Sequence, residues 1–173
     1  MTTLGHSLTG LAALAYVIPS HCSWLARLVW ATLFIALASI PDWPLPGWGH
    51  QDLSISHSLW LNMALCAAVA AILKKSAPER FGEAPLLAAG AFAWLSHILL
   101  DTLYGDLPGT AIFWPFSDAA VTLPVPWLQS LPHLPPPFDA TVIRILMLEL
   151  LTFAPLVLLG YWLRKRWGVA PRA

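Results

Sequence analysis

The sequence predicts an all-α integral membrane protein, a polytopic bundle of about five hydrophobic helices. Of its 173 residues, 58% are hydrophobic and only 10% are charged, whereas soluble domains carry roughly 25% charged residues. Mean hydropathy is +0.68. A soluble chain of this length could not bury so much apolar surface, but a bilayer solvates it. The ten Trp agree, because indole prefers the membrane–water interface. A formal net charge of zero leaves no basic stripe for nucleic acid.

Five apolar segments are expected to form the helices: 6–20, 24–40, 58–73, 85–100 and 142–163. A perpendicular crossing needs about 20 residues, which only the last segment reaches comfortably. The middle three are shorter and can cross where the bilayer thins locally. The first segment either spans or is partly re-entrant. We expect one domain over residues 1–173, and no secretory signal, since the N-terminus lacks a positive region.

Basic residues predict the orientation of these segments. They cluster after the third and fifth segments and at the start of the second: Lys74, Lys75, Arg80, Arg164, Lys165, Arg166, Arg172 and Arg27. The positive-inside rule places all of them on the cytoplasmic side. The chain then alternates across the membrane, with a cytoplasmic C-terminus and a first segment that starts outside. We expect the location to be a bacterial inner membrane.

The segment 102–141 is expected to be a long outer loop. It holds eight of the sixteen prolines, which block helix interiors, and several Trp and Phe lie between them. The interleaved aromatic residues argue against free disorder and favour a cap that packs on the outer face of the bilayer. The two cysteines, Cys22 and Cys66, form no disulfide framework and no CxxC metal motif.

On this topology, five polar residues fall at the outward ends of helices: His6, Asp42, His57, His97 and Asp101. His97 and Asp101 are four residues apart, so they share one helix face. Imidazole and carboxylate ligands suit zinc first, with manganese or iron as alternatives, and the lack of thiolate argues against a closed structural zinc site. The set is sufficient for one open site or for two metals. Taken singly, each residue also fits a plainer role, such as a headgroup contact, a helix stop or a hydrogen-bonded pair.

These residues lie in short motifs: Gly5-His6-Ser7, Pro41-Asp42, Ser56-His57-Ser58, Ser96-His97 with Asp101 and Gly105, and Trp114-Pro115-Phe116-Ser117. In combination they resemble the membrane-bound, YdjM-like metal-dependent hydrolases over about residues 5–118. The family is thought to be distantly related to zinc-dependent phospholipase C, so the resemblance implies phosphoester hydrolysis and a divalent metal. Two departures stand out. Pro44 replaces a second Asp, and Asp52-Leu53-Ser54 replaces a His-Arg-Gly whose Arg could have held a phosphate.

The remaining predictions concern chemistry around the metal. Asp118 is a candidate base or further ligand, and Asp52 is a candidate to take over as a ligand, as is His50. Glu149 lies deep in the last segment, where a carboxylate is costly. It either reaches the metal shell or, as we favour, bonds a neighbouring helix, with Asn62 as the candidate partner.

Three functions remain open at this stage. The first is a membrane-embedded metal hydrolase that acts on a phosphoester, with a phospholipid as one candidate, at the outer face. The second is a non-catalytic metal-binding protein with a structural or partner-binding role. The third, ranked last, is a small transporter or channel component.

Overall fold

The computed structural model describes residues 3–18, 22–43, 53–81, 84–104, 106, 109–123, 125–131 and 139–167. Throughout these ranges the regular structure is helical, and none of it is a β-strand. One isolated antiparallel bridge joins Thr110 to Val121. The all-α prediction is therefore confirmed.

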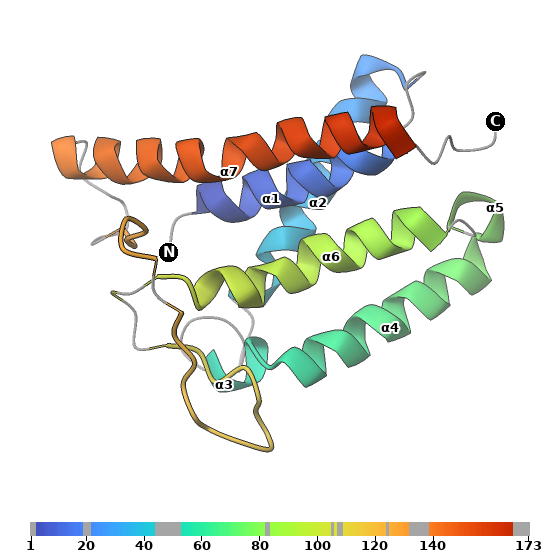
Figure 1. Cartoon of the computed structure of the whole chain (residues 1–173). Helices are drawn as coiled ribbons and strands as arrows, with labels where there is room; N and C mark the ends of the chain where they lie inside the picture. The colour runs from blue at the N-terminus through green and yellow to red at the C-terminus, as the bar shows by residue number, and fades with distance from the viewer. Residues whose placement is uncertain are drawn as a thin grey trace.

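Five longer helices form the bundle (Figure 1): α1 (Thr3–Val17), α2 (Trp24–Ser39), α4 (Leu59–Ser76), α6 (Ala84–Asp101) and α7 (Ala140–Trp167). Three short pieces join them: the 3₁₀ helix η1 (Ile40–Asp42), α3 (Leu53–Ser56) and α5 (Pro78–Phe81). By length and composition, four helices in the described residues can cross a membrane: α2 continued by η1, α4, α6 and α7. Each of the five predicted apolar segments overlaps one longer helix.

Local sequence sets where several of these helices begin and end. The hydroxyl groups of Ser23 and Ser58 accept backbone N–H bonds from the first turns of α2 and α4, each at 3.2 Å. Such N-caps satisfy donors that the helix itself leaves unbonded. The helix α4 ends at Ser76, two residues before Pro78, with Lys74 and Lys75 in its last turn. Both features favour a helix end there.

The helix α1, the shortest of the five longer helices, packs against α2, α6 and α7. At about 1.5 Å per residue it is roughly 22 Å long, less than the roughly 30 Å hydrocarbon core. Two glycines allow its close contacts. A Cβ on Gly10 would lie 2.5 Å from the carbonyl oxygen of Phe34 in α2, and one on Gly160 of α7 would lie 2.4 Å from that of Ala12. Small residues at crossings are how membrane helices approach closely.

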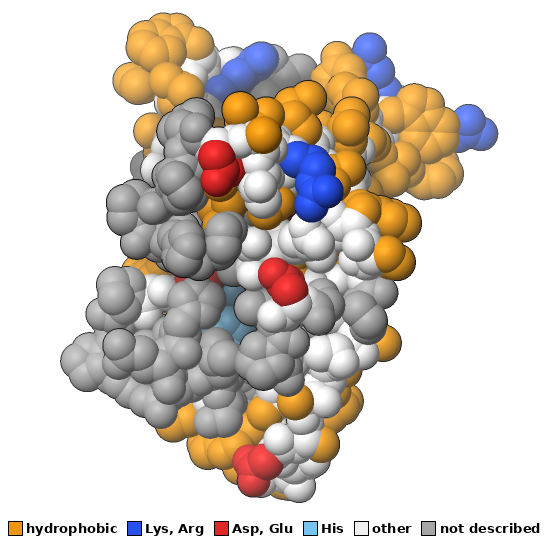
Figure 2. Space-filling model, turned by 90° about the vertical axis from the view of Figure 1, so that its left-hand side faces the viewer, with side chains coloured by type: hydrophobic (Ala, Val, Ile, Leu, Met, Phe, Trp, Pro, Cys, Tyr) orange, Lys and Arg blue, Asp and Glu red, His pale blue; other side chains and the backbone are white. Residues whose placement is uncertain are grey.

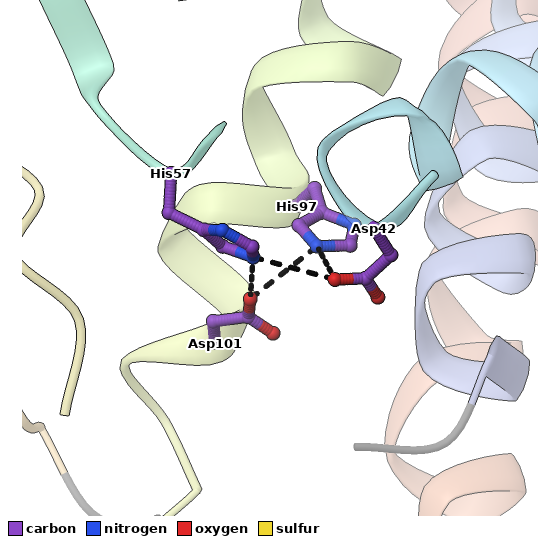
Figure 3. A group of neighbouring side chains, drawn as sticks. All are labelled: Asp42, His57, His97 and Asp101. Atoms are coloured by element: carbon purple, nitrogen blue, oxygen red, sulfur yellow. Dashed lines mark ion pairs between the residues drawn. The ribbon is translucent and has the colours of Figure 1, made fainter. Parts of the chain in front are cut away.

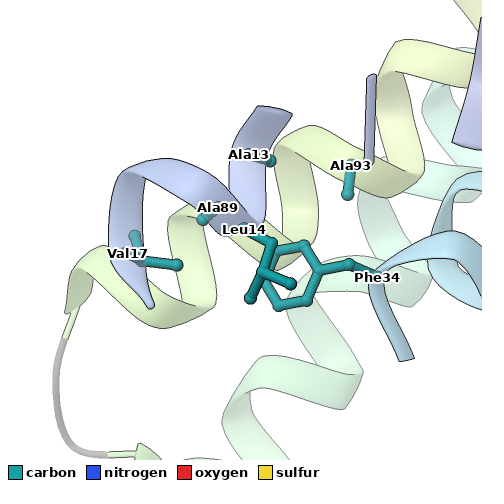
Figure 4. Packing of buried hydrophobic residues seen from close by; sticks show 6 residues of the cluster. All are labelled: Ala13, Leu14, Val17, Phe34, Ala89 and Ala93. Atoms are coloured by element: carbon teal, nitrogen blue, oxygen red, sulfur yellow. The ribbon is translucent and has the colours of Figure 1, made fainter. Parts of the chain in front are cut away.

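A cluster of buried apolar side chains joins α1, α2 and α6 (Figure 4). Phe34 of α2 lies at its centre, against Leu14 of α1 and the small Ala93 of α6. Phe34 is 1% exposed and Ala93 is 0% exposed. This packing fixes the relative positions of the two helices that end at the polar cluster described next.

The path of the chain brings five helix ends to one side of the bundle. The starts of α1, α4 and α7 lie there with the ends of α2 and α6 (Figure 1). Described parts of the segment after α6 fold back onto this side. The backbone N–H of Leu59 donates to the carbonyl oxygen of Ile112 at 2.8 Å, and that of Leu123 donates to Thr102 at 2.6 Å. Whether this segment lies on the outer face of a bilayer stays a prediction.

Candidate metal centre

Four side chains meet where α2 and α6 end and α4 begins: Asp42, His57, His97 and Asp101. Asp42 comes from η1, His57 precedes α4, and α6 supplies the other two from adjacent turns of one face. Each offers one ligand-type atom, and these four atoms lie within 4.8 Å of one another. The structure thus brings together four residues predicted from sequence as ligands.

The contacts join imidazole nitrogens to carboxylate oxygens (Figure 3). Nε2 of His57 lies 2.8 Å from Oδ2 of Asp101 and 3.4 Å from Oδ1 of Asp42. Nε2 of His97 lies 3.3 Å from each of the same two oxygens. Tetrahedral donors around an ion with bonds near 2.1 Å stand about 3.4 Å apart. Three of these four nitrogen–oxygen distances match this spacing, and all four donor atoms lie within 4.8 Å of one another.

The cluster is mostly buried but not fully closed off from solvent. The side chains of His57 and His97 are 0% exposed, that of Asp101 is 6% exposed, and that of Asp42 is 19% exposed. Figure 2 looks onto this end of the bundle, where histidine atoms are visible in a recess of the surface. Asp42 is therefore the member of the cluster that meets solvent most.

A hydrogen bond from Nδ1 of His97 determines that its other ring nitrogen, Nε2, faces the cluster. Nδ1 of His97 lies 2.7 Å from the carbonyl oxygen of Ala38, in the last turn of α2. A carbonyl only accepts, so Nδ1 carries the proton. A neutral His97 then has its lone pair on Nε2, directed at the cluster. Such an outer partner orients many metal-binding histidines.

A separate network holds His57. Its Nδ1 lies 2.7 Å from Oγ of Ser56, which leaves Nε2 for the cluster. Asn62 Nδ2 donates to the carbonyl oxygens of Ser56 and Ser58, each at 2.8 Å, on both sides of the histidine. The Asn62 Oδ1 accepts from Trp94 Nε1 at 2.7 Å. The amide nitrogen of Asn62 thus holds the turn that presents His57, and the amide oxygen links this turn to α6.

The other serines that flank the histidines in these motifs, Ser58 and Ser96, have different partners. Ser58 caps α4 and donates from Oγ to the carbonyl oxygen of Trp114 at 2.5 Å. Ser96 donates to the carbonyl oxygen of Ala93 in its own helix at 2.9 Å. Neither hydroxyl touches an imidazole through these bonds, so Ser56 is the serine that orients a candidate ligand.

His6 lies beside the four clustered residues. Its ring stacks on that of His97, with centroids 3.8 Å apart and planes 12° apart. Its Nε2 is 3.5 Å from Oδ1 of Asp101, the carboxylate oxygen that does not face His57. Imidazole lone pairs lie in the ring plane, so two nearly parallel stacked rings do not point at one ion. A role for His6 as a ligand stays a prediction, and it requires rotation of the ring or a second ion.

Electrostatics at the cluster favour a cation. Burial lowers the pKa of His57, but its contacts with the carboxylates of Asp101 and Asp42 outweigh burial and raise this pKa above its ordinary value. The surroundings of His57 thus stabilise positive charge. When both imidazoles are neutral, as metal ligation requires, the two ionised carboxylates leave a charge of −2, which one divalent cation neutralises in place of protons on the imidazoles. The donor set and its charge therefore fit a divalent metal ion.

The carboxylate of Glu149 has different partners from those expected. Instead of Asn62, it binds Tyr104, whose hydroxyl donates to Oε1 at 2.6 Å, and Gly5, whose N–H donates to Oε2 at 3.2 Å. Burial, together with the hydrogen bond to Glu149, raises the pKa of Tyr104, so the phenol stays protonated. This carboxylate on α7 ties down the residue before His6.

Asp118 is exposed and is not in the four-residue cluster. Asp52 and His50 lie outside the described residues. Sequence reasoning did not find the carbonyl of Ala38, because a backbone group carries no sequence signal. It could have given more weight to Asn62, since an amide in an apolar span usually has a specific partner.

Comparison with known proteins places the chain in a family but adds no structural template. No curated protein and no solved structure matches it. One family description, that of the YdjM inner membrane protein, matches residues 1–168. This span leaves only five residues of the 173-residue chain unmatched. It agrees with the four helices that can cross a membrane. The chain belongs to the YdjM inner membrane protein family.

Proposed function

We propose that this protein is a membrane-embedded, metal-dependent hydrolase that cleaves a phosphoester with water. The observation that carries the proposal is the cluster of two imidazoles and two carboxylates, with donor atoms within 4.8 Å of one another at one end of the bundle. Zinc is the first candidate for the ion, and manganese and iron are the alternatives, since mixed nitrogen and oxygen donors suit all three.

A divalent ion at these residues would lower the pKa of a bound water toward neutrality and polarise a phosphoryl oxygen. Hydrolysis forms a bond from the water oxygen to phosphorus and breaks the bond from phosphorus to the ester oxygen, which takes up a proton. Asp42, as the most exposed donor, marks the side from which water and substrate approach. Asp118 is our candidate for the base that handles the proton, Asp52 is a candidate to take over as a ligand, and His6 is a candidate fifth ligand.

We assign the site to the outer face of the membrane. The basic residues Lys74, Lys75, Arg164, Lys165 and Arg166 end α4 and α7. In Figure 1 these helix ends lie at the opposite end of the bundle from the end of α6 and the start of α4, where the cluster lies. The positive-inside rule then puts them, and the C-terminus, in the cytoplasm of a bacterium whose inner membrane holds the protein.

A second candidate function is favoured by burial of the cluster. His57 and His97 are 0% exposed, and four protein donors can complete the coordination of a zinc ion without water. Such a protein would bind metal for structure or as a platform for a partner. Its ion would resist chelators and would have no exchangeable bound water. Loss of the ion would lower the stability of the protein, and the protein would have no catalytic activity with or without the ion.

Purified protein in detergent, loaded with zinc or manganese, tests the first function against the second. We expect it to hydrolyse p-nitrophenyl phosphate or bis(p-nitrophenyl) phosphate, and we expect a chelator or His97→Ala to abolish the activity. Ala88→Leu, on the exposed face of α6, is the control and should keep it. A protein that holds its ion tightly and hydrolyses neither of these esters nor phosphatidic acid would refute the first function in favour of the second.

A further inference from the structure

An apolar trough lies between α2, α4 and α6. Its volume is about 330 Å³, and the residues that line it include Trp30, Leu37, Cys66, Leu73, Ala91 and Trp94. Charged side chains are absent from its lining, which lies entirely within the described residues. Cavities of this character exclude water and accept apolar groups.

The trough and the metal-binding cluster are built from the same three helices. α6 forms the floor of the trough and carries His97 and Asp101 at its end, while α2 leads into Asp42 and α4 follows His57. Within the described residues, α2 and α4 each pack on α6 rather than extensively on each other. The trough is therefore open between its two walls.

Two residues at one end of the trough, Trp94 and Leu37, adjoin residues that support the cluster. Trp94, which lines the trough, donates to Asn62, and Asn62 holds the turn at His57. Leu37, which also lines it, precedes Ala38, whose carbonyl oxygen holds Nδ1 of His97. Trp94 and His97 are three residues apart, about 4.5 Å along the helix axis. The apolar trough thus ends at residues that directly support the polar cluster.

We propose that the trough holds the hydrocarbon chain of the substrate while its phosphoester lies at the cluster, so that the substrate class is a lipid phosphate ester. This inference rests on the proposed function. The bilayer supplies the occupant, because α2, α4 and α6 can all cross a membrane and the gap between α2 and α4 opens toward its hydrocarbon. A water-soluble ester would leave the trough unused.

Turnover of two esters tests the assignment. Phosphatidic acid with 16-carbon chains, in mixed micelles, carries the chain, whereas p-nitrophenyl phosphate lacks it. Ala91→Leu places three more carbons in the trough, and Ala88→Leu makes the same change on an exposed position of α6 outside it. Each methylene displaced from an apolar site costs roughly fourfold in binding. We expect Ala91→Leu to lower the ratio of phosphatidic acid to p-nitrophenyl phosphate turnover at least tenfold, and Ala88→Leu to leave the ratio unchanged.

Gly90→Leu is a second variant should Ala91→Leu fold poorly. A Cβ on Gly90 lies 3.6 Å from Leu37 Cδ1, an ordinary contact, so the added side chain enters the trough without a clash at its base. It should lower the ratio in the same way.

Photo-crosslinking tests occupancy without turnover. Phosphatidic acid with a diazirine in mid-chain, added to chelator-treated protein, should label residues between Cys66 and Leu73 or between Leu86 and Trp94. Labelling spread equally over the exposed face of α7 would refute the trough as the binding site of the hydrocarbon chain. Turnover of both esters with no change in their ratio in Ala91→Leu and Gly90→Leu would overturn the trough and leave the proposed function intact. Hydrolysis of neither ester by metal-loaded protein would overturn the proposed function, and the substrate assignment with it.

Discussion

Replacing Ser56 with Ala removes the hydroxyl that lies 2.7 Å from Nδ1 of His57 and leaves the imidazole itself in place. Ser56 and His57 are both 0% exposed, so water has little access to take the place of the hydroxyl. Loss of such an outer partner typically costs 10–100-fold in metal affinity. This range corresponds to about 1.4–2.7 kcal/mol. We therefore expect Ser56→Ala to bind zinc 10–100-fold more weakly than the wild type.

Ser96→Ala is the matched control for this substitution. Ser96 precedes His97 as Ser56 precedes His57, and it is also buried, at 6% exposure. Its hydroxyl, however, donates to the carbonyl oxygen of Ala93 in its own helix. We expect its zinc affinity to stay within about twofold of the wild type. Competition with a chromophoric chelator in detergent measures both affinities. Equal losses in the two variants, or no loss in Ser56→Ala, would refute the orienting role.

Three further substitutions test the packing that supports the site, each by the midpoint of thermal unfolding in detergent. Gly10→Ala should destabilise by about 1–3 kcal/mol, because its Cβ would lie 2.5 Å from the carbonyl oxygen of Phe34. Gly90→Ala is its control, and an equal loss there would contradict this reading. Tyr104→Phe should cost about 1.5–3 kcal/mol, as it removes a hydrogen bond to a buried carboxylate; an unchanged midpoint would argue against that bond. Asn62→Leu should cost about 1–3 kcal/mol and also weaken metal binding, because it leaves a buried indole N–H without its partner. A loss of stability with unchanged metal affinity would show that Asn62 does not contribute to metal binding.

The sequence predicted the helical class because its apolar composition calls for a bilayer, and continuous apolar segments in a bilayer satisfy their backbone hydrogen bonds as helices. It also identified Asp42, His57, His97 and Asp101. The positions of Lys and Arg predicted a topology in which these four residues lie on the same side of the membrane, and the structure places one ligand-type atom of each within 4.8 Å of the others.

What the sequence did not predict depends on how the helices pack. The carbonyl of Ala38 reaches His97 only because α2 crosses α6 at a particular height. Glu149 bonds Tyr104 and Gly5 because α1 lies against α7, and Asn62 is occupied elsewhere. The parallel stacking of His6 on His97 is likewise a matter of side-chain orientation, which spacing along a sequence does not encode.

The metal content of the purified protein tests the central claim most directly. Elemental analysis of the wild type, extracted in detergent without chelators, should give about one divalent ion or more per chain. His97→Ala should lose the ion, since its Nε2 lies 3.3 Å from both clustered carboxylate oxygens. A folded wild type that contains no divalent metal and takes none up from solution would contradict the account.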